Sequence, residues 1–258
     1  MKRRGKRTRI IAWLLLALSI CVMAAAGYKL REIRLAYRVG DDSYAQLADR
    51  VHQDRKSEAP SGAAVEIPDL SIDFPALRAV NQDAAAWLYS PGTVIDYPIM
   101  QARDYDYYLR HLPDGTYNVN GTLFIDYNCA PDFSDRLTVL YGHNMKSGRM
   151  FGSLTGYKEQ SYFEKHPYMY LYTEQGNYRV DLLYGCVIGV GQWRERAFMY
   201  EANLDALLAY AAHNTTFTSG ARYTHGDRVI AMSTCSYEFD GARYVVIGVL
   251  QPALGGVR

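Results

Sequence analysis

The side chains best suited to covalent chemistry in this 258-residue sequence are its four cysteines. Cys235 closes the β-type run 229–234 and precedes a polar loop, where a rigid strand can present a nucleophile to a cleft. Because a thiolate attacks carbonyl carbon and forms a covalent intermediate, Cys235 is the predicted nucleophile. Cys129 and Cys186 follow or lie within apolar runs, and we interpret them as buried thiols, with a disulfide between them as the alternative.

A nucleophilic thiol needs a partner for proton transfer, and His143 is the best placed of the six histidines. The apolar run 137–141 ends in Gly142-His143-Asn144, so the imidazole lies at a strand end beside a glycine that allows close approach. The others lie in the N-terminal charged segment, in polar loops, before a proline or at a helix end, and we interpret them as surface residues: His52, His111, His166, His213 and His225.

A guanidinium is the third group with a predicted role. Arg243 opens the β-type run that follows Cys235, and its planar set of donors could stabilise the oxyanion of a tetrahedral intermediate. The alternative is an edge arginine held in a salt bridge. Ser233 and Thr234, next to the nucleophile, could donate hydrogen bonds to a substrate, and packing at the strand edge is an equally open interpretation.

The elements that must position these groups are mostly short strands. β-type runs cover residues 93–100, 122–127, 137–141, 168–173, 178–190, 228–233 and 243–250. Helical spacing is found at 74–88, before the sheet, and at 150–165 and 203–213 between strands. Many short strands with few helices predict a closed barrel or a sandwich.

The N-terminus predicts a membrane anchor. Residues 1–9 are strongly basic, and residues 10–27 carry no charge. As a helix this run would rise about 27 Å, close to the ~30 Å of a bilayer core. The positive-inside rule places residues 1–9 in the cytoplasm and the rest of the chain outside, as a single-pass protein of the cell membrane. A cleaved signal peptide, with Ala24-Ala25-Ala26 as its cleavage site, is the alternative, and Cys21 is interpreted as a lipid-embedded thiol.

The remaining chain divides into two parts. Residues 28–66 are charged and then rich in Pro, Ser, Gly and Ala, which indicates a stalk and linker, and residues 67–258 form the predicted catalytic domain. With 28 basic and 27 acidic residues, the net charge of +1 argues against a nucleic-acid partner held by phosphate contacts. No Cys or His pair has zinc spacing, so we expect no metal and no cofactor.

The combined motifs resemble those of a known family. Ser-Thr-Cys at 233–235, Ser-Tyr-Glu-Phe at 236–239, Arg243 on the next strand and Leu-Tyr-Gly-His-Asn at 140–144 closely resemble the signature of sortases, the cysteine transpeptidases of Gram-positive cell surfaces. The resemblance covers about residues 67–251. The helical extension before the barrel, the helix at 203–213 and the Ser-Thr-Cys-Ser-Tyr-Glu motif resemble class B. Ala231 and Met232 depart from the family's Thr-Leu-x-Thr-Cys pattern, and since Leu to Met conserves volume we expect catalysis to be unaffected.

The resemblance implies a closed eight-stranded antiparallel barrel that carries all three residues. It implies that Cys235 attacks the Thr carbonyl of a C-terminal sorting signal on a secreted protein, cleaving between Thr and Gly or Thr and Asn. Arg243 would hold the signal and stabilise the oxyanion, and His143 would act as the general acid and base. An amine of a peptidoglycan precursor would then release the thioacyl enzyme.

Three alternatives stay open from the sequence. A class C-like sortase would polymerise pilins through a pilin lysine, but its usual lid, an aromatic residue beside an acidic anchor, is only weakly matched by Asp69, Asp73 and Phe74. A hydrolytic cysteine peptidase would use the same Cys235 and His143. A non-enzymatic adhesin would fit the anchor and the β-rich body but would not require the three residues together.

Overall fold

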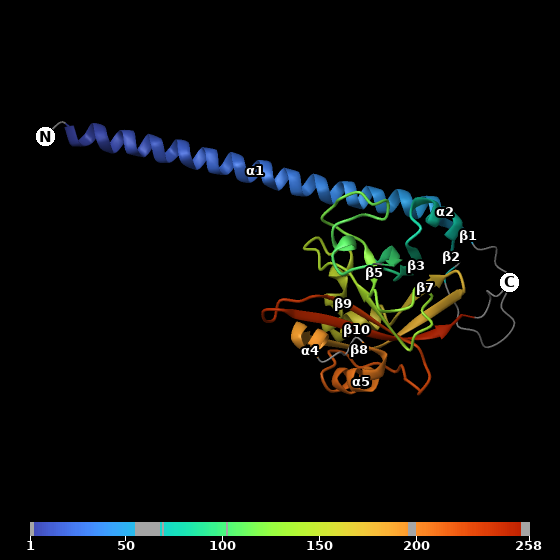
Figure 1. The fold of residues 1–258 in the computed structure, drawn as a ribbon. Coiled ribbons are helices and arrows are strands. Elements are labelled where there is room, and N and C mark those ends of the chain that lie inside the picture. The colour runs from blue at the N-terminus through green and yellow to red at the C-terminus, as the bar shows by residue number, and fades with distance from the viewer. Residues whose placement is uncertain (1–2, 55–67, 69, 102, 196–199, 254–258) are drawn as a thin grey trace.

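The structure, a computed structural model, describes residues 3–54, 68, 70–101, 103–195 and 200–253. A β-barrel body carries one long helix, α1 (Arg3–Val51), whose N-terminal half projects far from the barrel (Figure 1). The first and last parts of the described chain therefore meet at the body, while the N-terminus lies at the far end of the helix.

Eight strands close the barrel in the order β10-β8-β7-β3-β4-β5-β6-β9, which confirms the predicted closed eight-stranded barrel. Their bounds are β3 (Ala84–Tyr89), β4 (Asp96–Gln101), β5 (Leu123–Ile125), β6 (Leu137–Tyr141), β7 (Tyr168–Thr173), β8 (Gly176–Gly189), β9 (Val229–Cys235) and β10 (Ala242–Pro252).

The barrel is mixed, whereas an antiparallel barrel was expected. The pairs β4–β5 and β6–β9 run parallel, and the other neighbours run antiparallel. A parallel pair needs a long crossover, and residues 102–122 and 142–228 supply the two crossovers here.

Short helices and one small strand pair decorate the barrel. The helices are α2 (Phe74–Val80), α3 (Gln160–Lys165), α4 (Val190–Glu195) and α5 (Leu204–His213), with 3₁₀ turns η1 (Tyr107–Leu109), η2 (Phe151–Lys158) and η3 (Glu201–Asn203). The strand β1 (His52–Asp54) pairs with β2 (Leu70–Ile72). The helix predicted at 203–213 is confirmed by α5, and the helix predicted at 150–165 divides into η2 and α3 because Glu159 is extended.

The helix predicted over residues 74–88 is wrong in its second half. Asp73 caps α2 by accepting a 2.8 Å hydrogen bond from the Ala76 amide, but Asn81 has an extended backbone and ends the helix. The segment Ala84–Tyr89 then forms β3, which pairs with β4 on one side and β7 on the other. Pairing on both sides and burial of Trp87 override the helical preference of the alanines.

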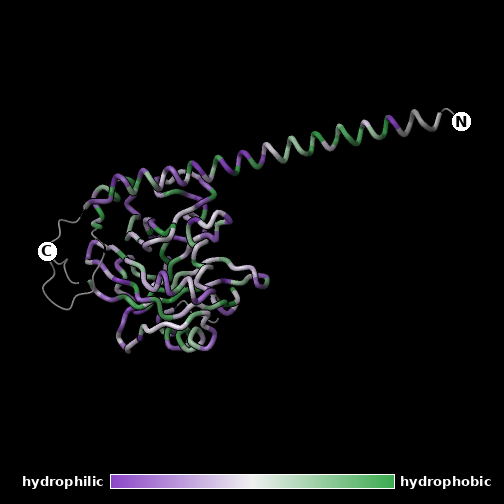
Figure 2. Tube along the Cα trace, turned by 180° about the vertical axis from the view of Figure 1, so that it is seen from behind, coloured by the Kyte–Doolittle hydropathy of each residue, from purple (hydrophilic) through white to green (hydrophobic). Residues whose placement is uncertain are grey.

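Two regions of α1 behave differently. Its N-terminal half contains a segment long and apolar enough to cross a membrane, none of it buried, and Figure 2 shows the hydrophobic colour concentrated there. Its C-terminal part packs on the barrel, where Tyr44, Leu47 and Val51 are buried. Helix α1 continues without a break through the predicted boundary between residues 27 and 28.

Hydrogen bonds fix the docked part of α1 to the loop 110–122. Asn118 Nδ2 donates to the Ala36 carbonyl at 2.9 Å, and Asn120 Nδ2 donates to the Tyr37 carbonyl at 3.3 Å. A Cβ on Gly40 would lie 2.1 Å from Asn120 Nδ2, so this contact requires glycine. The segment predicted as stalk thus contains docked helix, and the rest of that segment, residues 55–66, lies outside the described residues. The predicted domain boundaries stay predictions.

Candidate active site

The strands that carry the two predicted catalytic residues are parallel neighbours. The last paired residues of β6 and β9 are Tyr141 and Ser233. Because parallel strands run in the same direction, the residues two positions later, His143 and Cys235, leave the barrel at the same end. The fold therefore brings together two side chains that are far apart in sequence.

Hydrogen bonds hold these two strand ends together. The Gly142 amide donates to the Ser233 carbonyl at 3.3 Å, and Thr234 Oγ1 donates to the Gly142 carbonyl at 2.8 Å. Asn144 Nδ2 donates to the Cys235 carbonyl at 2.7 Å. Asn144 was missed as a functional residue, although it belongs to the Gly-His-Asn motif.

His143 is half-buried, and its ring is oriented by a backbone carbonyl. Nε2 lies 2.6 Å from the Leu109 oxygen. Because a carbonyl can only accept, Nε2 carries the donated hydrogen, and Nδ1 is left to exchange a proton. Leu109 ends η1, and the loop that follows contacts α1, so the docked helix and the histidine share one support.

Arg243 lies directly opposite Cys235 in the antiparallel pair of β10 and β9. Directly opposite residues place their side chains on the same face, with Cβ atoms about 4.5–5.5 Å apart. Arg243 is half-buried, and its Nη1 donates to the Ala242 carbonyl at 3.1 Å. Within the described part of the chain Arg243 forms no ion pair, so its other donors remain available.

Ser233 and Thr234 differ in what their hydroxyls do. Thr234 Oγ1 is already used in the bond to Gly142. Ser233 lies two residues before Cys235, on the same face of the strand, and its buried hydroxyl has no hydrogen-bond partner among the described residues. Of the two, Ser233 has the free donor that the predicted substrate contact would need.

The other barrel cysteines are buried thiols in this structure. All four cysteines are free, so Cys129 and Cys186 are not joined in a disulfide. Burial raises the pKa of Cys129 to about 11, and burial raises the pKa of Cys186 to about 12. Cys235 is half-exposed, which leaves it the accessible thiol of the barrel.

We predict selective alkylation on this basis. In the native Cys21→Ser chain, iodoacetamide near neutral pH should modify Cys235, while Cys129 and Cys186 stay protonated and shielded. Peptide mapping by mass spectrometry measures the modification, and the denatured chain, in which all three should react, is the control. Rapid labelling of Cys129 in the native chain would contradict this assignment.

One lysine fixes the turn between the nucleophile and Arg243. The buried Ser236 accepts a 2.9 Å hydrogen bond from Lys158 Nζ, and the same ammonium pairs with Glu238. Burial alone would raise the pKa of Glu238, but hydrogen bonds to Lys158 and Ser236 outweigh it and lower the pKa. Lys158, at the end of η2, was not predicted from the sequence.

Lys158→Met should therefore loosen this turn. Because the pair is partly exposed, we expect a loss of about 1 kcal/mol, which lowers Tm by roughly 2–4 °C in a domain of this size. Differential scanning calorimetry measures the shift. Lys158→Arg, which keeps the charge and the donors, should recover most of it, and equal destabilisation by both variants would argue against the bridge.

The geometry defines a class of enzyme. A closed barrel in which a half-exposed cysteine, a histidine on the parallel neighbouring strand and an opposing arginine meet at one end is the arrangement of the sortases, which are cysteine transpeptidases. The comparisons with known proteins agree with this class and narrow it.

The sequence is 33% identical over 178 residues to sortase B of Listeria monocytogenes, covering 67% of this chain and 72% of that protein. It is 25% identical over 177 residues to sortase B of Staphylococcus aureus. The structure of Bacillus anthracis sortase B in complex with AAEK1 superposes with a TM-score of 0.69 at 27% identity, covering 85% of this chain and all of that one. No protein-family model matches. The chain belongs to the class B sortases.

Proposed function

We propose that this transpeptidase cleaves a C-terminal sorting signal of a secreted protein between Thr and Gly, or Thr and Asn, and joins the protein to an amine of a peptidoglycan precursor. The strand register supports this proposal most directly, because it sets Cys235 opposite Arg243 and beside the strand that ends at His143. These three residues are proposed as the catalytic groups, with Ser233 and Thr234 as proposed substrate contacts.

In the first step, the Cys235 thiolate attacks the Thr carbonyl carbon and forms a C–S bond. The carbonyl oxygen becomes an oxyanion, which the Arg243 guanidinium stabilises. Collapse of the intermediate breaks the C–N bond, and His143 gives a proton to the leaving amine. Because Nε2 is held by the Leu109 carbonyl, the proton leaves from Nδ1.

In the second step, an amine of the wall precursor attacks the thioacyl carbon. His143 accepts the proton that this amine loses, and the Cys235 thiolate leaves. The chain's own side chains supply the nucleophile, the proton and the anion stabilisation. A solved sortase B is described as complexed with triglycine, and that of S. aureus as a substrate complex; we extend an amine-bearing acceptor to this chain as part of the proposal.

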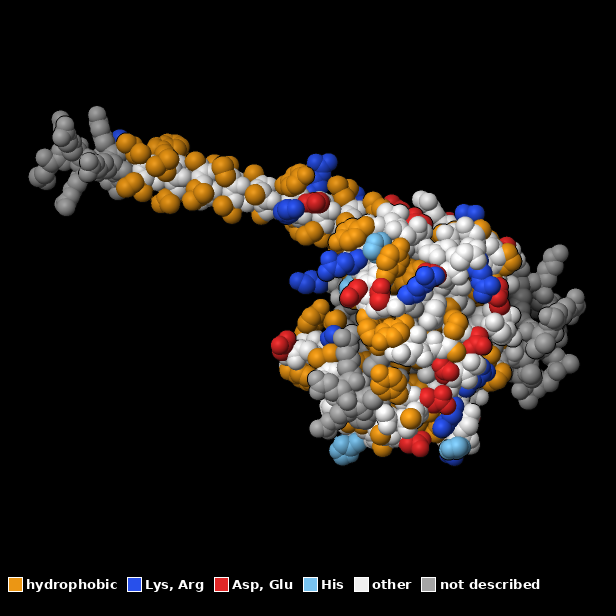
Figure 3. Space-filling model, in the orientation of Figure 1, with side chains coloured by type: hydrophobic (Ala, Val, Ile, Leu, Met, Phe, Trp, Pro, Cys, Tyr) orange, Lys and Arg blue, Asp and Glu red, His pale blue; other side chains and the backbone are white. Residues whose placement is uncertain are grey.

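We also propose that residues 10–27 of α1 span the cell membrane, with residues 1–9 in the cytoplasm and the catalytic domain outside. An apolar, unburied segment of α1 supports this placement, and Figure 3 shows hydrophobic side chains covering that part of the helix on the visible face. Residues 28–66 would then be the stalk and linker of the proposed domain division, and residues 67–258 the catalytic domain.

Two measurements test the proposed reaction. Purified chain is incubated with peptides of the forms Asn-Pro-x-Thr-Asn, Ser-Pro-x-Thr-Gly and Leu-Pro-x-Thr-Gly, with and without triglycine as acceptor. Cleavage with formation of the triglycine adduct supports transfer, while hydrolysis alone indicates a peptidase. Mass spectrometry of wall-linked proteins from cells with and without the chain identifies the client, and products linked through pilin lysines would favour the class C-like alternative.

A further inference from the structure

The barrel has two distinct ends. At one end, β10 begins at Ala242, which pairs with Gly189, and this end carries Cys235 and Arg243. At the other end, β10 reaches Pro252, which pairs with Tyr178 near the turn between β7 and β8. A strand of 11 residues rises about 3.3 Å per residue, so the two ends are roughly 33 Å apart.

The active-site end lies toward the N-terminal half of α1. In Figures 1 and 2, β10 and α1 run in the same general direction, and the turn between β9 and β10 points back along α1 toward its apolar half. Because Asn118 and Asn120 fasten α1 to the barrel and Tyr44 is buried beneath it, this direction is fixed by contacts within the chain.

The same turn carries exposed aromatic rings. Tyr237 is 74% exposed and Phe239 is 51% exposed, directly after the nucleophile. Large apolar side chains exposed together mark a surface that contacts a partner. Tyrosine has an apolar ring and a polar hydroxyl, which is why it gathers where a membrane meets water.

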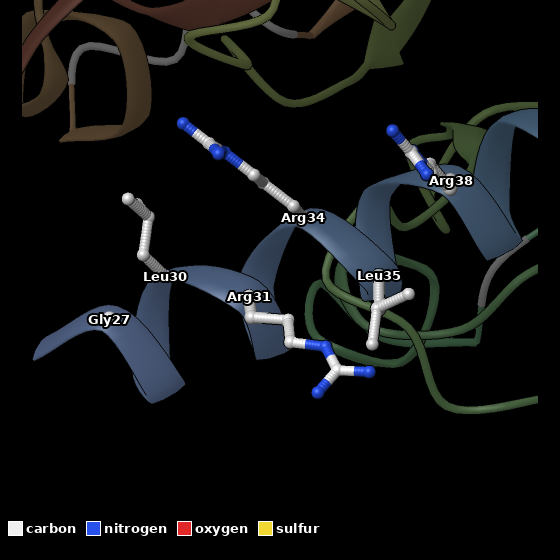
Figure 4. A pocket seen from close by; sticks show the side chains of 6 residues that line it. All are labelled: Gly27, Leu30, Arg31, Arg34, Leu35 and Arg38. Atoms are coloured by element: carbon white, nitrogen blue, oxygen red, sulfur yellow. The ribbon is translucent and has the colours of Figure 1, made fainter. Parts of the chain in front are cut away.

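Three arginines lie on α1 between the apolar segment and the docked part. Arg31, Arg34 and Arg38 follow i, i+3, i+7 spacing, which places them along one side of the helix, and with Gly27 and Leu30 they line a shallow hollow (Figure 4). Within the described residues none of the three forms an ion pair. Guanidinium groups suit phosphate oxygens.

The heights along α1 match a membrane surface. At about 1.5 Å per residue, Arg31 and Arg34 lie roughly 6 and 10 Å beyond residue 27, near the headgroup layer of about 5–8 Å that flanks a bilayer core. In the turn, Glu238 is neutralised by Lys158 and Asp240 is exposed. The attraction to phosphate therefore comes from α1, while the turn contributes its aromatic rings.

We propose that the active-site end of the barrel rests on the outer surface of the membrane. Tyr237 and Phe239 enter the headgroup layer, and Arg31 and Arg34 bind lipid phosphates. This placement rests on the membrane anchoring proposed above. It turns Cys235 toward the membrane, so that a client or an acceptor still attached to lipid meets the thiol without leaving the surface.

Tryptophan reporters in the full chain test the placement. The chain is reconstituted in vesicles of equal phosphatidylcholine and phosphatidylglycerol, some carrying lipid brominated near the headgroup, which quenches nearby tryptophan. The emission added by Tyr237→Trp, after subtraction of the parent's three tryptophans, should be strongly quenched. Gln175→Trp, in the exposed turn at the opposite end of the barrel, should keep its emission.

Charge variants provide the second measurement. In the Tyr237→Trp chain, Arg31→Gln with Arg34→Gln should reduce the quenching, whereas Arg50→Gln with Arg222→Gln, which removes the same charge elsewhere, should leave it unchanged. Equal quenching at positions 237 and 175, or none at 237 in a chain that floats with the vesicles, overturns the proposal. A chain that fails to float refutes the anchoring as well. Loss of peptide cleavage in the parent, with quenching retained, contradicts the proposed reaction alone.

Discussion

Cys235→Ala should abolish transpeptidation and leave the fold intact. The substitution removes the nucleophile, so no thioacyl enzyme forms, and we expect a loss of roughly 10⁴–10⁶-fold in kcat, as in other enzymes that form covalent intermediates. The cost to folding should be small, because the side chain is half-exposed at the end of β9 and only one sulfur is lost.

The assay for this variant is cleavage of the fluorescent peptide panel, with thermal unfolding followed by circular dichroism as the test of folding. Cys129→Ala is the matched control: it also removes one sulfur, but from a buried thiol, and it should keep full cleavage per folded molecule. Retained turnover in Cys235→Ala would move the nucleophile to Cys129 or Cys186.

Arg243→Lys should lose far more activity than a swap of one cation for another suggests. Lysine keeps the charge but lacks the planar set of donors, and loss of one oxyanion donor typically costs about 10²–10³ in kcat. The register opposite Cys235 places this side chain beside the reacting carbon, so the effect should fall on kcat more than on the stability of the barrel.

Steady-state kinetics on the preferred peptide measure this loss. Arg110→Lys, the same substitution at an exposed position, is the control and should match the parent. An Arg243→Lys enzyme within about twofold of the parent, where an oxyanion donor should cost 10²-fold or more, would reduce Arg243 to a structural residue.

The strands were predictable because their signal is local. Residues 137–141 and 168–173 match β6 and β7 in both bounds, and the other predicted strands differ mainly at their ends. β-Branched and aromatic side chains between turn residues mark such strands wherever they lie in the barrel. The positions of Cys235 and His143 at strand ends were predictable for the same reason.

Strand direction and pairing were not predictable from local signals. Nothing in residues 84–89 shows that they pair on both sides, and their alanines favour a helix, so β3 was missed. Likewise, the parallel pairing of β6 with β9 depends on how the long crossover returns to the barrel. The expectation of a wholly antiparallel barrel came from a family resemblance, which carries no register for this chain.

The supporting groups of the site were also beyond the sequence. Lys158 reaches Ser236 across 78 positions, and Asn144 reaches Cys235 across 91. Such contacts depend on side-chain placement after folding, and single polar residues in loops have no distinguishing pattern. The docking of α1 was missed because its charged sequence also fits a free stalk, and only the buried Tyr44, Leu47 and Val51 reveal the contact.

The parallel pair of β6 and β9 also determines when the enzyme becomes reactive. Thr234 and Gly142 bond across 92 positions, so the histidine strand cannot meet its neighbour until nearly the whole polypeptide has been made. Contacts of such long range are slow to form, since loop closure must precede any gain from pairing. We expect the thiol and the imidazole to come together in a late folding step, so that an incomplete chain holds a cysteine without its proton partner and leaves passing proteins uncut.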